Sequence, residues 1–159
     1  MKTFFSYTYD GVGKIEIGTE SDSITDVHFA KSFVPPTEYK KGETPLHSKA
    51  AKELSEYFEG IRKVFDLPLA PVGTDFQIRC WKALLQVPYG ETQSYGDIAR
   101  AVGSPKGFRA VGMANNRNPI SIIIPCHRII GADGKLVGFG GGLDIKEFLL
   151  ELEKKHAGS

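Results

Sequence analysis

Cysteine is scarce in this sequence, which holds only Cys80 and Cys126 among 159 residues. Two cysteines exclude a structural zinc site built from four thiolates. They permit a single disulfide, but so low a cysteine content favours a reducing compartment. We expect that compartment to be the cytoplasm, or the nucleus if the source is eukaryotic.

Long apolar runs are also missing. No segment approaches the roughly 18 apolar residues that a membrane helix needs, and the first residues are not followed by the apolar stretch of a secretory signal. The composition, with 41% hydrophobic and 25% charged residues, is that of a globular protein long enough for one domain or two small ones. We therefore expect no association with a membrane.

Carboxylates are absent between Asp97 and Asp133, although the formal net charge of the whole chain is only +1. This acid-free stretch holds five cations, namely Arg100, Lys106, Arg109, Arg117 and Arg128. Such a stretch suits a polyanion such as the phosphate backbone of a nucleic acid. The alternative is that the charges are scattered over different faces, and charge alone does not decide between the two.

The first half of the chain reads as three short strands followed by a helix. Residues 3–9, 13–19 and 24–29 are rich in aromatic and β-branched side chains, which predicts a small antiparallel meander. Apolar residues recur at helical spacing over residues 45–60. Residues 65–73 contain two prolines, and we expect them to form an extended linker between two lobes.

The second half reads as mainly helical. Thr74 and Gln77 have the spacing of a capping box at the start of a helix, and Cys80 lies on the apolar face of that helix as a core residue. Ser94 can cap a second helix, which a glycine-containing turn joins to a third helix over residues 106–116. A helix pair of this kind, with cations on its second member, is similar to a helix-turn-helix, although many helix pairs share the pattern. A last helix is expected from residue 144 to residue 155.

Cys126 is the most informative residue of the sequence. It ends an apolar segment, follows Pro125 and precedes His127 and Arg128. We interpret the apolar segment as a strand that presents the cysteine at its end, because a proline ends or turns a strand. Nearby positive charge lowers the pKa of a thiol, and the thiolate is the nucleophile. These neighbours favour a reactive cysteine over the buried structural cysteine that is more common.

An ordered set of motifs from about Leu46 to Glu153 resembles the O6-alkylguanine-DNA alkyltransferases, which are the methylated-DNA–protein-cysteine methyltransferases. The motifs are Tyr-Phe-Glu-Gly at 57–60, Phe-Asp-Leu-Pro-Leu at 65–69, Gly-Thr-Asp-Phe-Gln at 73–77, Pro-Tyr-Gly-Glu-Thr at 88–92, Ser-Tyr-Gly-Asp-Ile-Ala at 94–99, Arg-Ala-Val-Gly at 109–112, Asn-Pro at 118–119 and Pro-Cys-His-Arg at 125–128. Residues 1–44 match only loosely, as expected for the variable part of the family.

The resemblance implies an α+β fold of two lobes. Residues 1–72 would form a small N-terminal α/β lobe with an antiparallel, ribonuclease H-like sheet and a helix. Residues 73–159 would form a mainly helical C-terminal lobe that binds DNA through a winged-helix-like helix-turn-helix and carries the alkyl acceptor.

The resemblance also implies direct-reversal DNA repair. The alkyl group, typically methyl, would pass irreversibly from O6-alkylguanine in double-stranded DNA to Cys126, and O4-alkylthymine is a second candidate substrate. The damaged base would first be flipped out of the duplex, because chemistry on a stacked base is sterically blocked. Each protein molecule would act once, as a monomer, without a metal, an organic cofactor or an obligate protein partner.

The family pattern assigns catalytic roles residue by residue. His127 would act as the base toward Cys126 through a water molecule, and Glu153 would orient that histidine, as expected for an activated thiol. Asn118 would hydrogen-bond near the turn that aligns the active-site segment. Tyr95 would donate its hydroxyl to N3 of the guanine as the leaving group departs.

Other residues are assigned to DNA and to the substrate pocket. Arg109 would fill the gap left by the flipped base, and Phe108 and Ala110 would line the minor-groove face of the same helix. Further DNA contacts are expected from Ser94, Arg117 and Arg128. The pocket is expected to include Met113, Ile129, Phe139 and Gly140.

The chain departs from the family pattern in its glycine-rich loop. The usual Tyr-Ser-Gly-Gly reads Phe-Gly-Gly-Gly at 139–142. Phe139 keeps the ring but loses a hydroxyl, and Gly140 keeps only its backbone N–H as a donor toward O6 of guanine. The backbone carbonyls of Cys126 and Ile129 would accept from the exocyclic amine. We therefore expect altered rate and size selectivity rather than a different reaction.

Three other functions stay open at this point. An alkyltransferase-like protein would recognise the lesion without transfer, but relatives of that kind replace the reactive cysteine, so Cys126 argues against it. A helix-turn-helix regulator would bind a specific DNA sequence and form no alkyl adduct. A generic thiol enzyme such as a cysteine hydrolase is disfavoured by the cation-rich segment and the helix pair.

Overall fold

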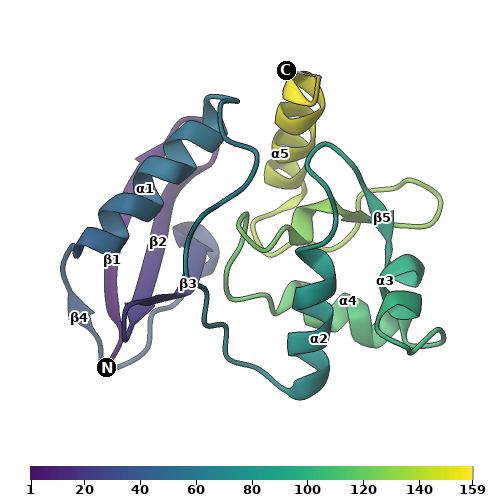
Figure 1. The fold of residues 1–159 in the computed structure, drawn as a ribbon, viewed down its shortest axis with the longest axis horizontal. Coiled ribbons are helices and arrows are strands. Elements are labelled where there is room, and N and C mark those ends of the chain that lie inside the picture. Colours follow the sequence, from purple (N-terminus) through teal and green to yellow (C-terminus); the bar gives the residue numbers. More distant parts are fainter. Residues whose placement is uncertain (159) are drawn as a thin grey trace.

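A four-stranded sheet forms the N-terminal part of the computed structural model, which describes residues 1–158 (Figure 1). Strands β1 (Thr3–Tyr9), β2 (Gly13–Glu20) and β3 (Ser23–Phe29) are antiparallel neighbours, which confirms the predicted meander. The short strand β4 (Lys40–Lys41) runs parallel to β1, giving the order β3-β2-β1-β4. Two exposed lysines carry no β-strand signal, so this edge strand could not be predicted.

Helix α1 (Pro45–Phe58) lies over one face of the sheet, as Figure 1 shows. Thr44 caps the helix, since its hydroxyl accepts from the backbone N–H of His47. Ala50, Leu54 and Tyr57, three or four residues apart, are completely buried. The apolar spacing therefore identified both the helix and its inward face.

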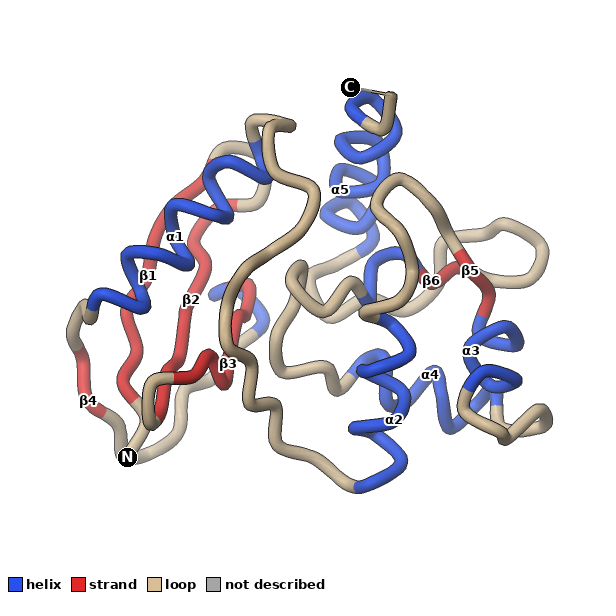
Figure 2. The backbone as a smooth tube through the Cα atoms, viewed as in Figure 1, coloured by secondary structure: helices blue, strands red, loops and turns tan. Residues whose placement is uncertain are grey.

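The predicted linker is extended, as expected, but it is also paired with the sheet. The backbone N–H of Ile24 on β3 donates to the carbonyl of Pro68, and the N–H of Ala70 donates back to Ile24, both at 2.8 Å. A short 3-10 helix, η1 (Ala30–Ser32), directly follows β3 along the chain. Strand β3 is thus held between the rest of the sheet and the helices that follow the linker (Figure 2).

The C-terminal part holds four helices: α2 (Asp75–Leu84), α3 (Tyr95–Ala101), α4 (Phe108–Asn116) and α5 (Leu143–His156). The Thr74–Gln77 capping box and the Ser94 cap are both present, which confirms the predicted starts of α2 and α3. Helices α2, α3 and α4 pack against one another. A two-stranded parallel sheet joins β5 (Gln93–Ser94) to β6 (Ile129–Ile130). The architecture is therefore mixed α+β.

The apolar segment before Cys126 is not a strand, so that prediction was wrong. Residues 121–124 form consecutive turns, and Cys126–Arg128 form a second 3-10 helix, η2. Ile122 has φ +72°, which is an outlier for a β-branched residue. The N–H of Ile123 donates to Ser121 and that of Cys126 donates to Ile124, both at 2.8 Å, so tight turns replace strand pairing. Hydrophobicity and β-branching favoured a strand, but the turns prevail, and the N–H of Ser121 ties them to the carbonyl of Val27 on β3 at 2.9 Å.

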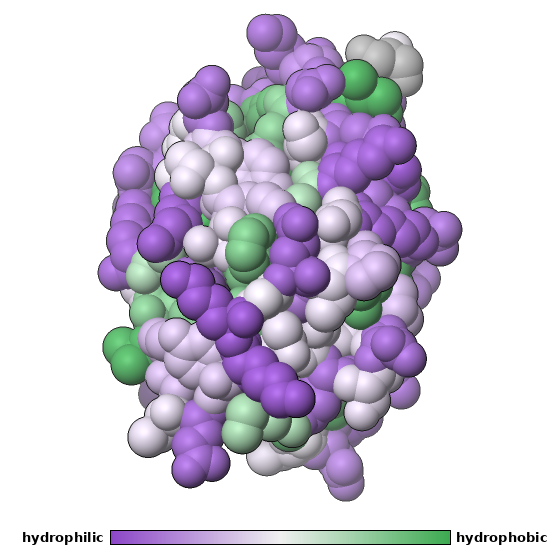
Figure 3. All heavy atoms as spheres, turned by 90° about the vertical axis from the view of Figure 1, so that its left-hand side faces the viewer, coloured by the Kyte–Doolittle hydropathy of each residue, from purple (hydrophilic) through white to green (hydrophobic). Residues whose placement is uncertain are grey.

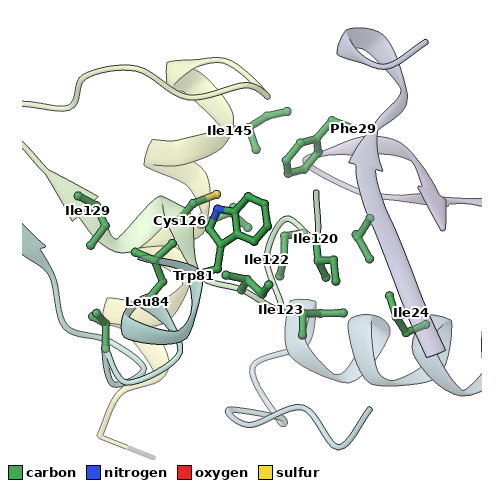
Figure 4. Packing of buried hydrophobic residues seen from close by; sticks show 14 of the residues in the cluster. Ile24, Phe29, Trp81, Leu84, Ile120, Ile122, Ile123, Cys126, Ile129 and Ile145 are labelled. Atoms are coloured by element: carbon green, nitrogen blue, oxygen red, sulfur yellow. The ribbon is translucent and has the colours of Figure 1, made fainter. Parts of the chain in front are cut away.

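A continuous core connects the sheet to the helices (Figure 4). Trp81 is 2% exposed, and its indole N–H donates to the carbonyl of Ala114 at 2.9 Å, which fixes α2 against α4. Cys80 belongs to this core, as predicted, and both cysteines are free thiols. The outer face of the sheet side is mostly hydrophilic, with isolated apolar residues (Figure 3). Within residues 1–158, the helices are too short or too polar to cross a bilayer.

Candidate active site

Asn118 braces the turns that lead to Cys126. Its side-chain Nδ2 donates to the carbonyl of Ile124 at 2.8 Å, and its Oδ1 accepts from the N–H of Ile120 at 3.0 Å. Both ends of the turn segment are thereby tied to one buried amide. This placement agrees with the position that the family pattern gives Asn118, and it explains how an isoleucine with positive φ is held in place.

Glu153, on α5, is the central acceptor of the site and is 1% exposed. Its Oε2 accepts from Tyr57 Oη and His127 Nε2, both at 2.6 Å, and from Arg128 Nη2 at 3.1 Å. Its Oε1 accepts from Arg128 Nε at 2.8 Å and from the N–H of Gly90 at 3.1 Å. Burial opposes the charged form, but these donors outweigh it and hold the pKa of Glu153 well below its usual value.

His127 is completely buried, which favours the neutral form of its imidazole. Burial lowers the pKa of its imidazole, and Arg128 and Lys146 add repulsion, while Glu153 only partly opposes this. Because the Glu153 carboxylate accepts from Nε2, the proton lies on Nε2. Nδ1 therefore carries a lone pair, and it has no hydrogen-bond partner among the described residues. This nitrogen is suited to receive a proton.

The thiol of Cys126 is 4% exposed, and burial raises its pKa. A hydrogen bond with Asn118 and the positive charge of Lys146 act in the opposite direction but do not cancel the effect of burial. The expectation of a thiolate stabilised by Arg128 was therefore wrong, because the guanidinium of Arg128 is paired with Glu153. In this structure the cysteine needs a base to become a nucleophile.

Lys146 was missed by the sequence analysis. It lies on α5 with 0% exposure, and its ammonium donates to the carbonyl of Ile129 and, at 3.0 Å, to that of Val137. Burial lowers the pKa of this amine, and the charge of Cys126 raises it. Lysines are almost always exposed, and nothing in the sequence around Lys146 distinguishes it from a surface residue. Only the packing of α5 shows that it is internal.

Tyr95 begins α3 and is half-buried. Its hydroxyl donates to the carbonyl of Val137 at 3.1 Å, so α3 contacts the loop that precedes the glycines. Burial raises its phenol pKa, and the charge of Cys126 adds to this effect, so Tyr95 is a hydrogen-bond donor at neutral pH. The hydroxyl predicted to reach guanine is thus engaged with the loop in this structure.

A cavity of about 340 Å³ adjoins Cys126. Phe139 and Gly140 line it, as predicted for the pocket, together with Asn118, Ser121 and other residues of both parts of the molecule. Its walls also include Asn115, whose Oδ1 is buried without a partner among the described residues. That oxygen is an acceptor available to a bound molecule.

Met113 and Ile129, which were predicted as pocket residues, do not line this cavity. Met113 is 62% exposed on α4, whereas Asn115, two positions later, faces inward and donates to the carbonyl of Cys126 at 3.3 Å. The two residues face opposite ways because two residues turn a helix by roughly 200°. Ile129 is fully buried, and its carbonyl accepts from Lys146.

The DNA-binding residues predicted on and beside α3 and α4 are wholly or partly accessible. Phe108, Arg109 and Ala110 are exposed at the start of α4, and Arg117 is exposed at its end. The hydroxyl of Ser94 is half-buried and caps α3. The remaining candidate, Arg128, lies in the interior.

The prediction that Arg128 contacts DNA was wrong. Its side chain is 8% exposed, and two of its nitrogens donate to Glu153. A third donates to the carbonyl of Val87 at 2.8 Å. The guanidinium of Arg128 is therefore part of the interior network. Moving it away from Glu153 would leave two buried opposite charges without partners, which is costly.

Known proteins are similar to this chain in both sequence and structure. Residues 75–155 match the family model described as the 6-O-methylguanine DNA methyltransferase, DNA binding domain. A methylated-DNA–protein-cysteine methyltransferase of Methanosarcina acetivorans is 50% identical over 145 residues, which are 89% of this chain and 92% of that protein. A relative of the same name from Methanosarcina barkeri is 62% identical over 108 residues, or 68% of each chain.

This chain belongs to the methylated-DNA–protein-cysteine methyltransferase family. A crystal structure of Mycobacterium tuberculosis OGT in complex with DNA superposes on it with a TM-score of 0.88 at 43% identity, covering 98% of this chain and 93% of the other. As a methyltransferase of this family, the protein has Cys126, His127 and Glu153 inside the matched DNA-binding region. The expected family and the mixed α+β architecture are confirmed.

Proposed function

We propose that this methyltransferase repairs DNA by direct reversal, transferring an alkyl group from O6 of guanine to Cys126 once per molecule. The observation that carries the proposal is the buried Cys126–His127–Glu153 arrangement beside a cavity. A bond forms between Sγ and the alkyl carbon while the bond from that carbon to O6 breaks. The thiol proton leaves through the base, and the departing guanine takes up one proton, so the products are a thioether and an unmodified guanine.

His127 is the proposed base. Its Nδ1 holds the available lone pair, and its Nε2–H is fixed by Glu153 at 2.6 Å. Cys126 and His127 are consecutive in η2, and Nδ1 of His127 has no hydrogen-bond partner among residues 1–158. We therefore propose that one water relays the proton from Sγ to Nδ1. Tyr95 is proposed to donate its hydroxyl to N3 of guanine once the loop bond to Val137 is exchanged for the base.

Double-stranded DNA is the proposed substrate carrier. The family match to a DNA-binding domain and the M. tuberculosis OGT–DNA complex support DNA as the partner. We assign the α3–α4 pair as the helix-turn-helix, with Arg109 at the exposed start of α4 as the residue that replaces the flipped base. Phe108 and Ala110 are proposed to flank it, and Arg117 to contact phosphate.

The predicted lobes, residues 1–72 and 73–159, are retained as part of the proposal. The family model begins at residue 75, immediately after the extended linker, which supports this division. The order β3-β2-β1-β4, with β4 parallel to β1, supports a ribonuclease H-like first lobe. The three mutually packed helices α2, α3 and α4 support a winged-helix-like second lobe. A monomer in a reducing compartment, the cytoplasm, completes the proposal.

The decisive experiment is the intact mass of the protein after reaction with duplex DNA that contains one O6-methylguanine. The expected result is a gain of one methyl group, located by peptide mapping on the peptide that holds Cys126. Cys126→Ala is expected to take up no methyl group while it still binds the duplex, and Cys80→Ala is the matched control that retains transfer. Tight binding of the lesion by the unaltered protein without any mass change would instead favour the recognition-only function.

A further inference from the structure

One wall of the 340 Å³ cavity comes from the sheet side of the molecule. The residues of β3 and η1 that line it are His28, Phe29, Ser32 and Phe33. Cys126 lies on the same cavity, although almost a hundred residues separate it from this group. Figure 4 shows Phe29 extending from β3 toward the region that holds Cys126 and Ile145. The alkyl acceptor therefore faces a wall that the matched DNA-binding domain does not supply.

The position of this wall is fixed by backbone pairing with the active-site segment. The N–H of Val27 on β3 donates to the carbonyl of Pro119 at 2.8 Å, and the N–H of Ser121 donates to the carbonyl of Val27 at 2.9 Å. Val27 also forms an isolated parallel bridge with Ile120. His28 follows Val27 on β3, so this pairing fixes the position of the wall relative to the turns that lead to Cys126.

His28 and Phe33 form a flat aromatic platform on this wall. Their ring centroids lie 3.9 Å apart, and the ring planes are tilted by only 5°. His28 is held from behind, since its Nε2 bonds Oδ2 of Asp26 at 2.8 Å, and Asp26 in turn accepts from Lys2 at 2.8 Å. The platform is thus organised before any ligand arrives, which lowers the cost of stacking a further ring on it.

Phe29 connects the same wall to the glycine-rich loop. Its ring packs on that of Phe139 with centroids 5.8 Å apart. A Cβ atom placed on Gly141 would lie 2.6 Å from the Phe29 ring, so only glycine allows the loop to approach β3 this closely. At Gly140, by contrast, a Cβ atom would meet no atom within 4 Å, and the cavity is open there.

The cavity is far larger than a methyl group requires. A methyl group is similar in size to a water molecule, which occupies about 30 Å³ in the liquid, so it would fill only about a tenth of the cavity. Gly140, which was assigned to O6 of guanine, lines the cavity, whereas Tyr95 and Ile129, which were assigned to other parts of the base, do not. The space beside Cys126 is therefore available to the part of an alkyl group that lies beyond the reacting carbon.

We propose that the sheet side determines alkyl specificity, with the His28–Phe33 platform accepting O6-alkyl groups that carry an aromatic ring. This inference rests on the proposed transfer to Cys126 and adds the class of adduct and the residues that select it. A benzylic carbon attacked by Sγ would direct its ring sideways from the line of attack, into the cavity and against Phe33.

The test compares rates of transfer from duplexes that carry either O6-benzylguanine or O6-methylguanine. For Phe33→Ala, the ratio of the benzyl rate constant to the methyl rate constant is expected to fall about tenfold, the effect of losing one aromatic stacking partner. Phe33→Leu, which keeps most of the volume but removes the flat ring, is expected to lower the same ratio severalfold. The leucine variant keeps the test valid if Phe33→Ala fails to fold.

Tyr39→Ala is the matched control, because Tyr39 and Phe33 both pack on Phe4, at 5.5 Å and 5.6 Å, but Tyr39 does not line the cavity. Its benzyl-to-methyl ratio is expected to equal that of the unaltered protein. An unchanged ratio in both Phe33 variants, or an equal change in Tyr39→Ala, would overturn the proposal that Phe33 selects the alkyl group. An unaltered protein that transfers methyl but never benzyl would also overturn it. Failure of the unaltered protein to transfer either group would instead refute the proposed transfer itself.

Discussion

Replacing Glu153 by glutamine tests whether the buried carboxylate holds the site and the fold together. The substitution keeps the shape of the side chain but removes its charge, and it places an NH₂ group among donors. Arg128, with 8% of its side chain exposed, then keeps its charge without a counter-ion. Removing one partner of a buried ion pair costs about 3–5 kcal/mol, a large share of the total stability of about 5–15 kcal/mol.

This loss converts into a clear thermal shift. For a chain of 150–250 residues, each 1 kcal/mol lowers Tm by about 2–4 °C, so Glu153→Gln is expected to lower it by roughly 6–20 °C. Urea unfolding at pH 7 followed by circular dichroism gives the same free energy independently. Glu56→Gln is the matched control, because Glu56 also accepts from an arginine, Arg62, at 2.9 Å, but both side chains are 28% exposed. Such a partly exposed pair is expected to contribute at most about 1 kcal/mol.

The pH dependence supplies a second check with a defined sign. The folded-state pKa of Glu153 is depressed, so its contribution to stability is complete above the unfolded value of about 4.3 and is lost as the pH falls below it. The difference between the unaltered protein and Glu153→Gln should therefore shrink as the pH is lowered from 5 toward 3. A glutamine variant no less stable at pH 7 than the Glu56→Gln control would refute the reasoning.

Three further predictions follow from the site. Arg109→Ala is expected to slow repair of O6-alkylguanine in duplex DNA at least tenfold more than reaction with free O6-benzylguanine, and equal losses in both assays would contradict its role in base flipping. Because burial raises the pKa of the Cys126 thiol, the ultraviolet absorbance of a thiolate should be absent at pH 7 when the unaltered protein is compared with Cys126→Ala, and a thiolate signal at that pH would contradict the need for a base. Gly141→Ala should destabilise the protein by about 1–3 kcal/mol through its clash with Phe29, while Gly140→Ala changes stability by less than about 0.5 kcal/mol, and similar Tm values for the two variants would disprove the close contact.

Local signals in the sequence predicted most of the secondary structure. The alternation of Ile15 and Ile17, the spacing of Ala50, Leu54 and Tyr57, and the capping pattern at Thr74 all depend on residues close together in the chain. The segment before Cys126 shows where such signals fail. Its isoleucines favour a strand, but Asn118 and the pairing with Val27 hold tight turns there, and neither partner is visible in a local pattern.

The site itself could be predicted in composition better than in geometry. The resemblance grouped Cys126 and His127 with the distant Glu153, and the structure places His127 against Glu153. The motif around Cys126 could not show that Arg128 turns inward, because a positively charged residue in an acid-free stretch is normally exposed. Nor could it show that Lys146 is buried, since only the docking of α5 brings that residue to the carbonyl of Ile129.

The carboxylate of Glu153 also links chemical competence to the completion of folding. Its donors come from α1, from the loop before β5 and from η2, while Glu153 itself comes from α5. A chain in which α1 or α5 has not yet docked would lack the phenol or the carboxylate that surrounds His127, so Cys126 would have no oriented base and would react slowly with the alkyl group. Because each molecule is proposed to act once, this coupling keeps incompletely folded molecules from reacting at Cys126. A loss of reactivity at Cys126 should therefore be an early sign of misfolding in any element that contacts Glu153.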